Sequence, residues 1–344
     1  MKRMLPLLPS RSGESPELSP EDKYVPIRLD SVQNNTELDF DLYLENSKNG
    51  NKRLYRSRDL VFQDKHRERL LENNISVLFI SREDVNKYYV YVESHLGTLV
   101  SNPDVVPKEK ASILYEASIY RIQQILEEPD RPENIERSLV LVDHTIYFLI
   151  NEERALESFL ETMSFDYSTY THSMNVCALS VLLAQRHEIN DPETLKILGI
   201  GSLLHDIGKS KIKPEVLFKK GPLNNEEWKL IKEHPAIGYD LLKSNQLIPK
   251  RSLSPVRHHH ERADGSGYPD GLPQESIDIL ASIVRVSDIF DAITTNRCYK
   301  KAAPAFEALN IMKDEMKSKR DKEIFHDLIM LLGPKRSKEM LLSH

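Results

Sequence analysis

The sequence predicts a mainly α protein, in which an all-α helical bundle follows a small α+β domain. Two observations support this fold class. From Ala155 onward, apolar residues recur at helical spacing and no alternating pattern interrupts them, which is typical of helices packed against one another. Between Tyr24 and Val100, short runs instead alternate apolar and polar residues, which indicates strands with a few helices among them.

The composition is that of an ordinary globular protein with room for two domains, since 344 residues include 40% hydrophobic and 29% charged residues. A net charge of −6 offers no general attraction to a nucleic acid polymer or an anionic membrane, so any anionic substrate must be bound locally. No apolar run approaches the roughly 20 residues of a membrane span. The first apolar segment is too short and too rich in proline for a signal peptide. Cys177 and Cys298 provide neither a disulfide framework nor a cysteine zinc site. We therefore expect a cytoplasmic protein.

The chain divides into four predicted segments, of which the first is rich in Ser, Pro and Glu and lacks periodicity. The α+β segment carries no motif that we can attach to chemistry, so it is either a regulatory module or a structural appendage. The two amphipathic helices after it either pair across a homodimer or form the first layer of the bundle. The segments are a disordered tail (1–22), a small α+β candidate regulatory domain (23–102), connecting helices (103–152) and the helical domain (153–344).

Within these segments, periodicity and breaker residues predict the individual elements. The α+β domain is expected to contain strands near 24–29, 38–44, 52–56 and 77–80, and helices at 64–73 and after Arg82. The connecting helices are expected at 108–127 and 132–151. The bundle helices are expected at about 155–163, 168–187, 191–206, 213–217, 224–244, 252–260, 276–295, 302–316 and 322–332.

The bundle helices carry histidines and aspartates at positions that we expect to be interior. A lone core histidine is usually just hydrogen-bonded, but a buried carboxylate needs a partner, and here several such groups occur together. Together they exceed one tetrahedral site and favour two metals about 3.5–4 Å apart, bridged by a carboxylate. Imidazole and carboxylate ligands without thiolate suit iron, manganese or zinc rather than magnesium. The candidate groups are His172, His205, Asp206, His234, the run His258–His260 and Asp288.

Three cations lie near these ligands along the chain and indicate an anionic substrate such as a phosphate ester. Lys209 follows His205 by one turn, and Arg297 and Lys300 follow the helix of Asp288. The loop at 264–271 has glycines that permit tight turns and close backbone approach, and it includes Tyr268, which could contact a base or a phosphate. Taken alone, such a loop is more often a simple connector.

Four motifs in this order resemble the HD-GYP domain: HDIGK at 205–209, EHPAIG at 233–238, HHERADGSGYP at 259–269 and SDIFDA at 287–292. This domain is the branch of the HD metal-dependent phosphohydrolases that degrades cyclic di-GMP in bacteria. The resemblance covers roughly residues 155–335 and does not extend to residues 1–100. It implies that the helical bundle is an HD-type phosphohydrolase domain.

The resemblance also implies roles for single residues. One metal would be held by His172, His205 and Asp288, and the other by His234, His259 and His260, with Asp206 as the bridge and His258 as a neighbour. Lys209, Arg297 and Lys300 match positions that contact substrate phosphates, and Tyr268 matches the tyrosine of the GYP loop. Asp206 and Lys209 are the expected catalytic residues. The metals implied are two divalent ions, iron first and manganese as the alternative.

The implied activity is hydrolysis of the 3′-5′ phosphodiester of cyclic di-GMP by a water or hydroxide that bridges the two metals. One cut gives pGpG and a second gives GMP. Some family members place a glutamate that helps to bind a third metal where this chain has Ser168, so we expect two metals and a bias toward pGpG. The family commonly has proline at the position of Cys298.

Two alternatives stay open at this point. The substrate could be another cyclic dinucleotide, 3′,3′-cyclic GMP-AMP, because no residue was identified that distinguishes guanine from adenine. The domain could instead be a catalytically weak cyclic di-GMP sensor that acts through protein contacts of residues 1–150. The partners implied are cyclic di-GMP, a diguanylate cyclase with a GGDEF domain or other signalling proteins, and a second copy of the chain in a homodimer.

Overall fold

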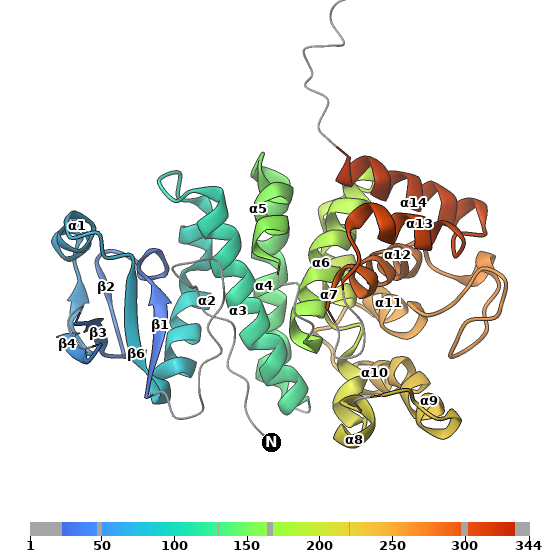
Figure 1. Cartoon of the computed structure of the whole chain (residues 1–344), viewed down its shortest axis with the longest axis horizontal. Helices are drawn as coiled ribbons and strands as arrows, with labels where there is room; N and C mark the ends of the chain where they lie inside the picture. The colour runs from blue at the N-terminus through green and yellow to red at the C-terminus, as the bar shows by residue number, and fades with distance from the viewer. Residues whose placement is uncertain are drawn as a thin grey trace, which may run out of the picture. The chain divides into compact units, whose positions relative to one another are not determined.

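The computed structural model describes residues 23–46, 50–129, 131–163, 168–219, 221–296 and 302–333 (Figure 1). The predicted tail at 1–22 lies outside these residues. The chain forms two compact units, one made of residues up to 124 together with 133–162, and the other of 125–132 together with residues from 163 onward. Most described residues are helical and the strands are confined to the first unit, so the predicted fold class is confirmed. The domain boundaries at 102 and 152 stay predictions.

The first unit contains two small antiparallel sheets. The larger sheet has the strand order β1-β6-β3-β4, in which Tyr24 lies opposite Ser81 and Tyr43 lies opposite Phe79. The smaller sheet pairs β2 with β5. The strands are β1 (Tyr24–Arg28), β2 (Thr36–Glu37), β3 (Leu42–Glu45), β4 (Lys52–Arg56), β5 (Val61–Phe62) and β6 (Val77–Ser81).

The strand expected at 38–44 is shorter than predicted, because only its second half pairs in the sheet. Leu38 and Phe40 are fully buried but belong to no strand. The carboxylate of Asp41 accepts a hydrogen bond from the Arg58 backbone N–H at 2.7 Å, and the Leu38 carbonyl accepts one from Asp59. These bonds to a neighbouring turn take the place of ladder bonds, so alternation of apolar residues alone overestimated the strand.

Helices make up the rest of the first unit, and an ion-paired cluster joins three of them. Glu93 of α2 accepts hydrogen bonds from Arg121 of α3 at 2.7 Å and from Arg137 of α4 at 2.6 Å. Because Glu93 and Arg121 are buried, each charge depends on the other for its stability. The helices are α1 (Asp64–Glu72), α2 (Val85–Ser101), α3 (Pro107–Glu127), α4 (Pro132–Asn151) and α5 (Ala155–Thr162), with 3₁₀ turns at Leu29–Ser31 and Arg82–Asp84.

The second unit is a helical bundle around α6. Every residue of α6 from 171 to 184 is buried, because this helix packs against α7 on one side and α12 on another. Side-chain caps define the helix starts: Ser168 accepts from the Thr171 N–H and Asn224 accepts from the Glu227 N–H. The elements are α6 (Thr169–Arg186), α7 (Pro192–Leu203), α8 (Pro214–Leu217), α9 (Asn225–Lys232), α10 (His234–Leu242), α11 (Leu253–His258), α12 (Ile279–Thr294), α13 (Ala305–Lys313) and α14 (Lys319–Leu332), with 3₁₀ turns at Ile207–Lys211 (η3), Lys250–Ser252 and Gln274–Ser276.

The single helix expected at 224–244 is wrong, since the structure has two helices there. α9 ends at Lys232, Glu233 caps it, and α10 begins at His234 with Pro235 in its first turn. A proline has no N–H to continue the helix and its ring clashes with the preceding turn, so the chain starts a new helix at this point. This break places His234 at a helix start rather than inside a helix.

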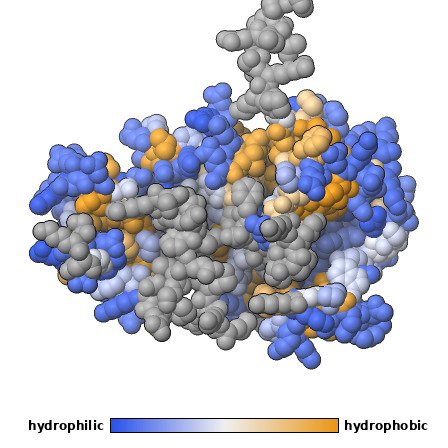
Figure 2. All heavy atoms as spheres, viewed as in Figure 1, coloured by the Kyte–Doolittle hydropathy of each residue, from blue (hydrophilic) through white to orange (hydrophobic). Residues whose placement is uncertain are grey.

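Figure 2 shows polar and charged residues over most of the visible face, with apolar residues gathered over α13 and α14. The exposed apolar side chains of these two helices are Phe306, Ile311, Ile329 and Met330. Among the described residues, no helix combines the length and the apolar character that crossing a membrane requires.

Candidate metal centre

The second unit brings all seven predicted ligands to one place in its interior. His172 comes from α6, and Asp288 comes from α12. The other five lie at helix ends: His205 and Asp206 in the turn between α7 and η3, His234 at the start of α10, and His259 and His260 directly after α11. The four histidines other than His260 are at most 1% exposed, and Asp206 is as deeply buried.

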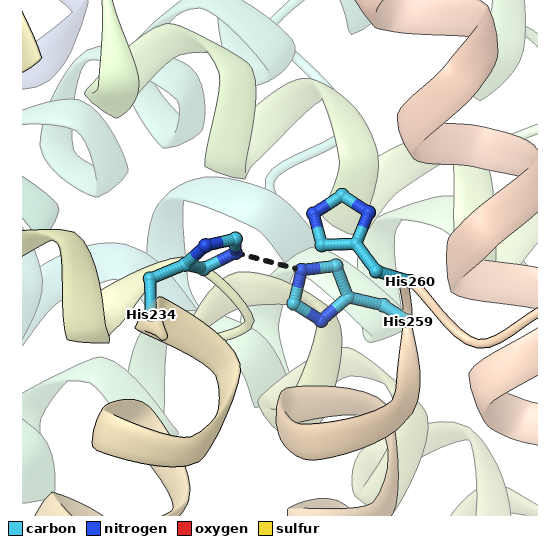
Figure 3. A group of neighbouring side chains, drawn as sticks. All are labelled: His234, His259 and His260. Carbon is cyan, nitrogen blue, oxygen red and sulfur yellow. Dashed lines mark hydrogen bonds between the residues drawn. The ribbon is translucent and has the colours of Figure 1, made fainter. Parts of the chain in front are cut away.

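The histidines form two groups. In the first, ligand atoms of His172, His205 and Asp206 all lie within 4.8 Å of one another, and Asp288 Oδ1 lies 3.1 Å from His172 Nε2. In the second, His234, His259 and His260 converge from two helix ends (Figure 3), with 3.2 Å between the Nε2 atoms of His234 and His259.

The carboxylate of Asp206 lies between the two groups. Its Oδ2 atom is 3.4 Å from His205 Nε2 and 3.6 Å from His172 Nε2. Its Oδ1 atom is 3.2 Å from His234 Nε2. One oxygen therefore faces each group, which is the placement that a carboxylate bridging two cations requires.

Hydrogen bonds orient the imidazole rings toward the centre. The Nδ1 atoms of His205 and His234 each lie 2.7 Å from a backbone carbonyl, of Ser202 and Ile231 respectively. His259 Nδ1 lies 2.9 Å from the Pro255 carbonyl. A carbonyl only accepts, so Nδ1 carries the proton in each ring and the lone pair of Nε2 points inward.

The ring of His172 is oriented by a carboxylate instead. Its Nδ1 atom lies 2.7 Å from Asp291 Oδ2, and Asn175 donates to the other oxygen of Asp291 at 2.7 Å. Our sequence reasoning assigned no role to Asp291, although its position three residues after Asp288 places it on the same face of α12. This spacing is the signal that would have identified it.

The charges and burial of the cluster fit bound cations. His205 Nε2 and Asp206 Oδ1 are buried without a hydrogen-bond partner among the described residues, and a buried polar atom without a partner is costly. Burial lowers the pKa of His259 well below its usual range, and the neighbouring His260 lowers it further. Burial alone would raise the pKa of Asp206, but Lys209 and His205 hold it well below its ordinary value. Neutral imidazoles and ionised carboxylates are the forms that bind metals.

Two predicted substrate contacts lie at the edge of the cluster. The ammonium of Lys209 is 2.5 Å from Asp206 Oδ2, and its side chain is half-buried. The ring of Tyr268 stacks on His260, with centroids 4.7 Å apart and planes inclined by 27°. Burial, followed by the charges of Asp288 and Asp206, raises the pKa of Tyr268, so its hydroxyl stays protonated.

The loop that carries Tyr268 is held by Glu261, a second residue to which sequence reasoning gave no role. Glu261 is buried, and its carboxylate accepts hydrogen bonds from the backbone N–H groups of Asp270, Gly271 and Leu272 at 2.7–3.1 Å. Gly267 passes so close to Glu261 that an added Cβ would lie 2.5 Å from its Cα. The loop at 264–271 is therefore held against the segment that carries His259 and His260.

The remaining sequence predictions fall in three places. His258 lies outside both histidine groups, because its ring pairs with Asp270 at 3.1 Å. Ser168 is occupied as the cap of α6. The predicted phosphate contacts Arg297 and Lys300, and also Cys298, lie outside the described residues.

Comparisons with known proteins relate part of the chain to a known family. Residues 151–324, just over half of the chain, match the family model of the HD domain. The protein named cyclic di-GMP phosphodiesterase PA4108, from Pseudomonas aeruginosa, is 38% identical over 193 residues, which are 56% of this chain and 46% of that protein. The protein named 3′3′-cGAMP-specific phosphodiesterase 3, from Vibrio cholerae, is 35% identical over 161 residues, 46% of this chain and 34% of that protein. The chain thus spans less than half the length of these two relatives.

A solved structure shares the fold. Bd1817 of Bdellovibrio bacteriovorus, described as an HDG“Y”P protein, superimposes with a TM-score of 0.62 at 23% sequence identity, over 90% of this chain and all of that one. Because the family model matches just over half of the chain, the chain belongs to the HD domain family, and its four motifs lie around the buried cluster as the resemblance to the HD-GYP branch implies.

Proposed function

We propose that this chain is a metal-dependent phosphodiesterase that hydrolyses a cyclic dinucleotide, with cyclic di-GMP as its first substrate. The observation that carries this proposal is the Asp206 carboxylate, which lies with one oxygen toward each of two groups of buried histidines. The names of relatives such as the Pseudomonas protein support the choice of substrate.

The ligands divide between two divalent cations. His172, His205 and Asp288 would hold one, and His234, His259 and His260 the other, with Asp206 contacting both. Iron, with manganese as its substitute, suits a site of imidazoles and carboxylates without thiolate. When bound, two such cations lower the pKa of a water molecule and offset the negative charge of the phosphoryl group.

The protein side chains position the substrate. Lys209 reaches the edge of the centre, where its ammonium can bind a non-bridging phosphate oxygen and offset charge as it grows during in-line attack. Arg297 and Lys300 are proposed as further phosphate contacts from the family resemblance. Asp291 and the three backbone carbonyls keep the ring protons on Nδ1 in four of the five histidines, so that Nε2 of His172, His205, His234 and His259 stays available as a ligand.

The expected product is pGpG. Ser168 stands where some members of the branch have a glutamate, and its hydroxyl caps α6 through the Thr171 N–H at 3.1 Å. A capped serine is a poor ligand for a third metal, so the second cut to GMP should be slow. Chromatography of a reaction sampled over time should show pGpG accumulating before GMP, and rapid, direct appearance of GMP would refute this part of the proposal.

A second candidate substrate is 3′,3′-cyclic GMP-AMP, because a relative from Vibrio cholerae carries that specificity in its name. The two substrates differ only in one base, and both present the same phosphodiester to the metal centre. Side-by-side kinetics therefore decide between them.

The test loads the purified chain with iron or manganese and assays both cyclic dinucleotides. We expect turnover that Asp206→Ala abolishes together with metal binding, measured by elemental analysis of the protein. Asp240→Ala is the matched control, because Asp240 is an exposed residue of α10 whose carboxylate pairs with Lys243 at 2.6 Å. Binding of cyclic di-GMP without turnover under either metal would favour a sensor, and turnover that survives Asp206→Ala would refute the two-metal site.

A further inference from the structure

The only tryptophan of the chain, Trp228, lies on the surface of α9 and is 46% exposed. Lys232 follows it by one helical turn, and its ammonium lies 5.7 Å from the centroid of the indole ring. The same ammonium lies 5.4 Å from the centroid of the Tyr268 ring. Two aromatic rings from separate elements therefore flank a single cation, both within the range of a cation–π contact.

This group continues outward from the candidate metal centre. Tyr268 stacks on the ligand His260, and α9 leads through Glu233 directly into the ligand His234. From the centre outward the order is His260, Tyr268, Lys232 and Trp228, and each contacts the next. If a ligand placed a phosphate at the candidate metal centre, the parts of the ligand next to that phosphate would contact these side chains.

Two other lysines near α9 form ion pairs with carboxylates, whereas the ammonium of Lys232 lies against the two aromatic rings. Lys229 pairs with Glu226 at 3.1 Å, and Lys219 pairs with Glu227 at 2.6 Å. Among the described residues, no ion pair joins Lys232 to a carboxylate. An exposed cation held between π faces, in a protein of net charge −6, is suited to receive an anion from solution.

We propose that Trp228 and Lys232 form a nucleotide-binding wall beside the metal centre, with the indole stacked on one purine base of a cyclic dinucleotide and the ammonium bound to the phosphate that is not cleaved. This assignment rests on the proposed function and extends it to the specificity of the site. An aromatic face stacks on either purine, so the wall selects a base-bearing phosphodiester without distinguishing guanine from adenine.

The test uses the emission of Trp228, which as the sole tryptophan reports directly on this wall. Rapid mixing of the manganese-loaded chain with cyclic di-GMP should quench that emission saturably, before product forms. Trp228→Ala should raise KM about 10- to 100-fold, the range for loss of one stacked base, with kcat nearly unchanged. Trp228→Phe should retain most of the affinity. Lys232→Gln should raise KM and weaken its dependence on salt.

Matched controls lie on the same helix. Leu230→Ala removes a comparably exposed apolar side chain, and Lys229→Gln removes a lysine that pairs with Glu226; both should keep the wild-type KM. If Trp228→Ala does not fold, the wild-type emission and the Trp228→Phe kinetics still decide the question.

The outcomes separate the two proposals. Wild-type turnover with unquenched emission, or with an unchanged KM in Trp228→Ala, overturns the wall and leaves the proposed function intact. A fall in kcat and melting temperature without a change in KM also overturns it, because that indicates a structural role. Absence of both binding and turnover of cyclic dinucleotides by the wild type overturns the proposed function and the wall together.

Discussion

Single residues around the cluster determine which ring nitrogen of a histidine faces the candidate metal centre. Asp291 orients His172 through a 2.7 Å contact with Nδ1. In Asp291→Asn, the amide can present its NH₂ group to that nitrogen and favour the other tautomer, which places a proton on Nε2. We expect metal affinity to fall about 10- to 100-fold, as measured by competition with a chelator.

Asp327→Asn provides a matched control for this substitution. Asp327 contacts His187 Nδ1 at 2.6 Å, and neither residue belongs to the candidate centre. The control should bind metal like the wild type. Equal metal affinity in Asp291→Asn and the wild type would show that Asp291 does not set the tautomer of His172.

Glu261 is a second single residue that supports the site, because it holds the loop that carries Tyr268. Its two oxygens accept three backbone N–H groups of the Tyr268 loop. Glu261→Gln replaces one acceptor with a donor that faces another donor, which should cost about 1–3 kcal/mol of stability. The loosened loop should raise KM for the cyclic dinucleotide, followed alongside the melting temperature. Glu275→Gln, at an exposed position just after the loop, should change neither quantity.

At the scale of elements, the centre depends on how closely η3 approaches α10. Gly208 of η3 lies so near the start of α10 that an added Cβ would be 2.0 Å from the His234 carbonyl oxygen and 2.7 Å from the Gly238 nitrogen. Gly208→Ala must therefore separate the turn that carries Asp206 from the helix that carries His234. We expect a loss of about 1–3 kcal/mol or more, measured by denaturant unfolding, together with reduced metal content.

The neighbouring residue Ser210 offers the control for this substitution. It lies in the same turn, and its hydroxyl has no hydrogen-bond partner among the described residues. Ser210→Ala should bind metal like the wild type and be at least as stable, because it removes a buried hydroxyl that has no hydrogen-bond partner among the described residues. Wild-type stability and metal content in Gly208→Ala would refute the close approach.

At the scale of the whole molecule, the two units should respond to pH in opposite directions. In the second unit, burial lowers the pKa of His234 and His259 and brings that of His260 to about 3, although Asp288 opposes the shift in His260. Below about pH 6.5 these histidines become protonated in the unfolded chain, whereas in the folded cluster they stay neutral to lower pH. The metal-free unit therefore loses stability as the pH falls below about 6.5, through the buried histidines whose pKa the fold lowers.

In the first unit, Glu116 has the opposite effect. Burial raises its pKa to about 7, although Arg28, which lies 3.2 Å away and also binds Glu109, lowers it. The folded unit keeps a proton that the unfolded chain releases above about pH 4.5. Its contribution is therefore stabilising at low pH and is lost as the pH rises through about 7.

Hydrogen exchange resolved by peptide, corrected for intrinsic rates, separates these two responses in the metal-free protein. Acidification from about pH 7.5 to about pH 5.5 should reduce protection in the second unit and increase it in the first. Glu116→Gln should remove the response of the first unit alone. Parallel loss of protection in both units would contradict the assignment of these groups.

Much of the fold and the ligand set could be predicted from the sequence. Helical periodicity located the bundle, and it placed His172 and Asp288 in the interior because their faces are otherwise apolar. The break at Pro235 was also readable, because a proline inside a helical pattern interrupts the helix, but the predicted helix at 224–244 ran through it. The short strand at Leu42 was overestimated because periodicity does not reveal which backbone groups pair elsewhere.

The sequence by itself determined which residue types fill the interior of the bundle, and therefore that imidazoles and carboxylates meet there. Only the tertiary structure decided that Asp206 lies between the two histidine groups, that Asp291 and Glu261 support the site, and that Lys232 lies between Trp228 and Tyr268. The physical reason is distance along the chain. His172 and Asp291 are 119 positions apart, and no local pattern reports a contact that only the packing of α6 against α12 creates.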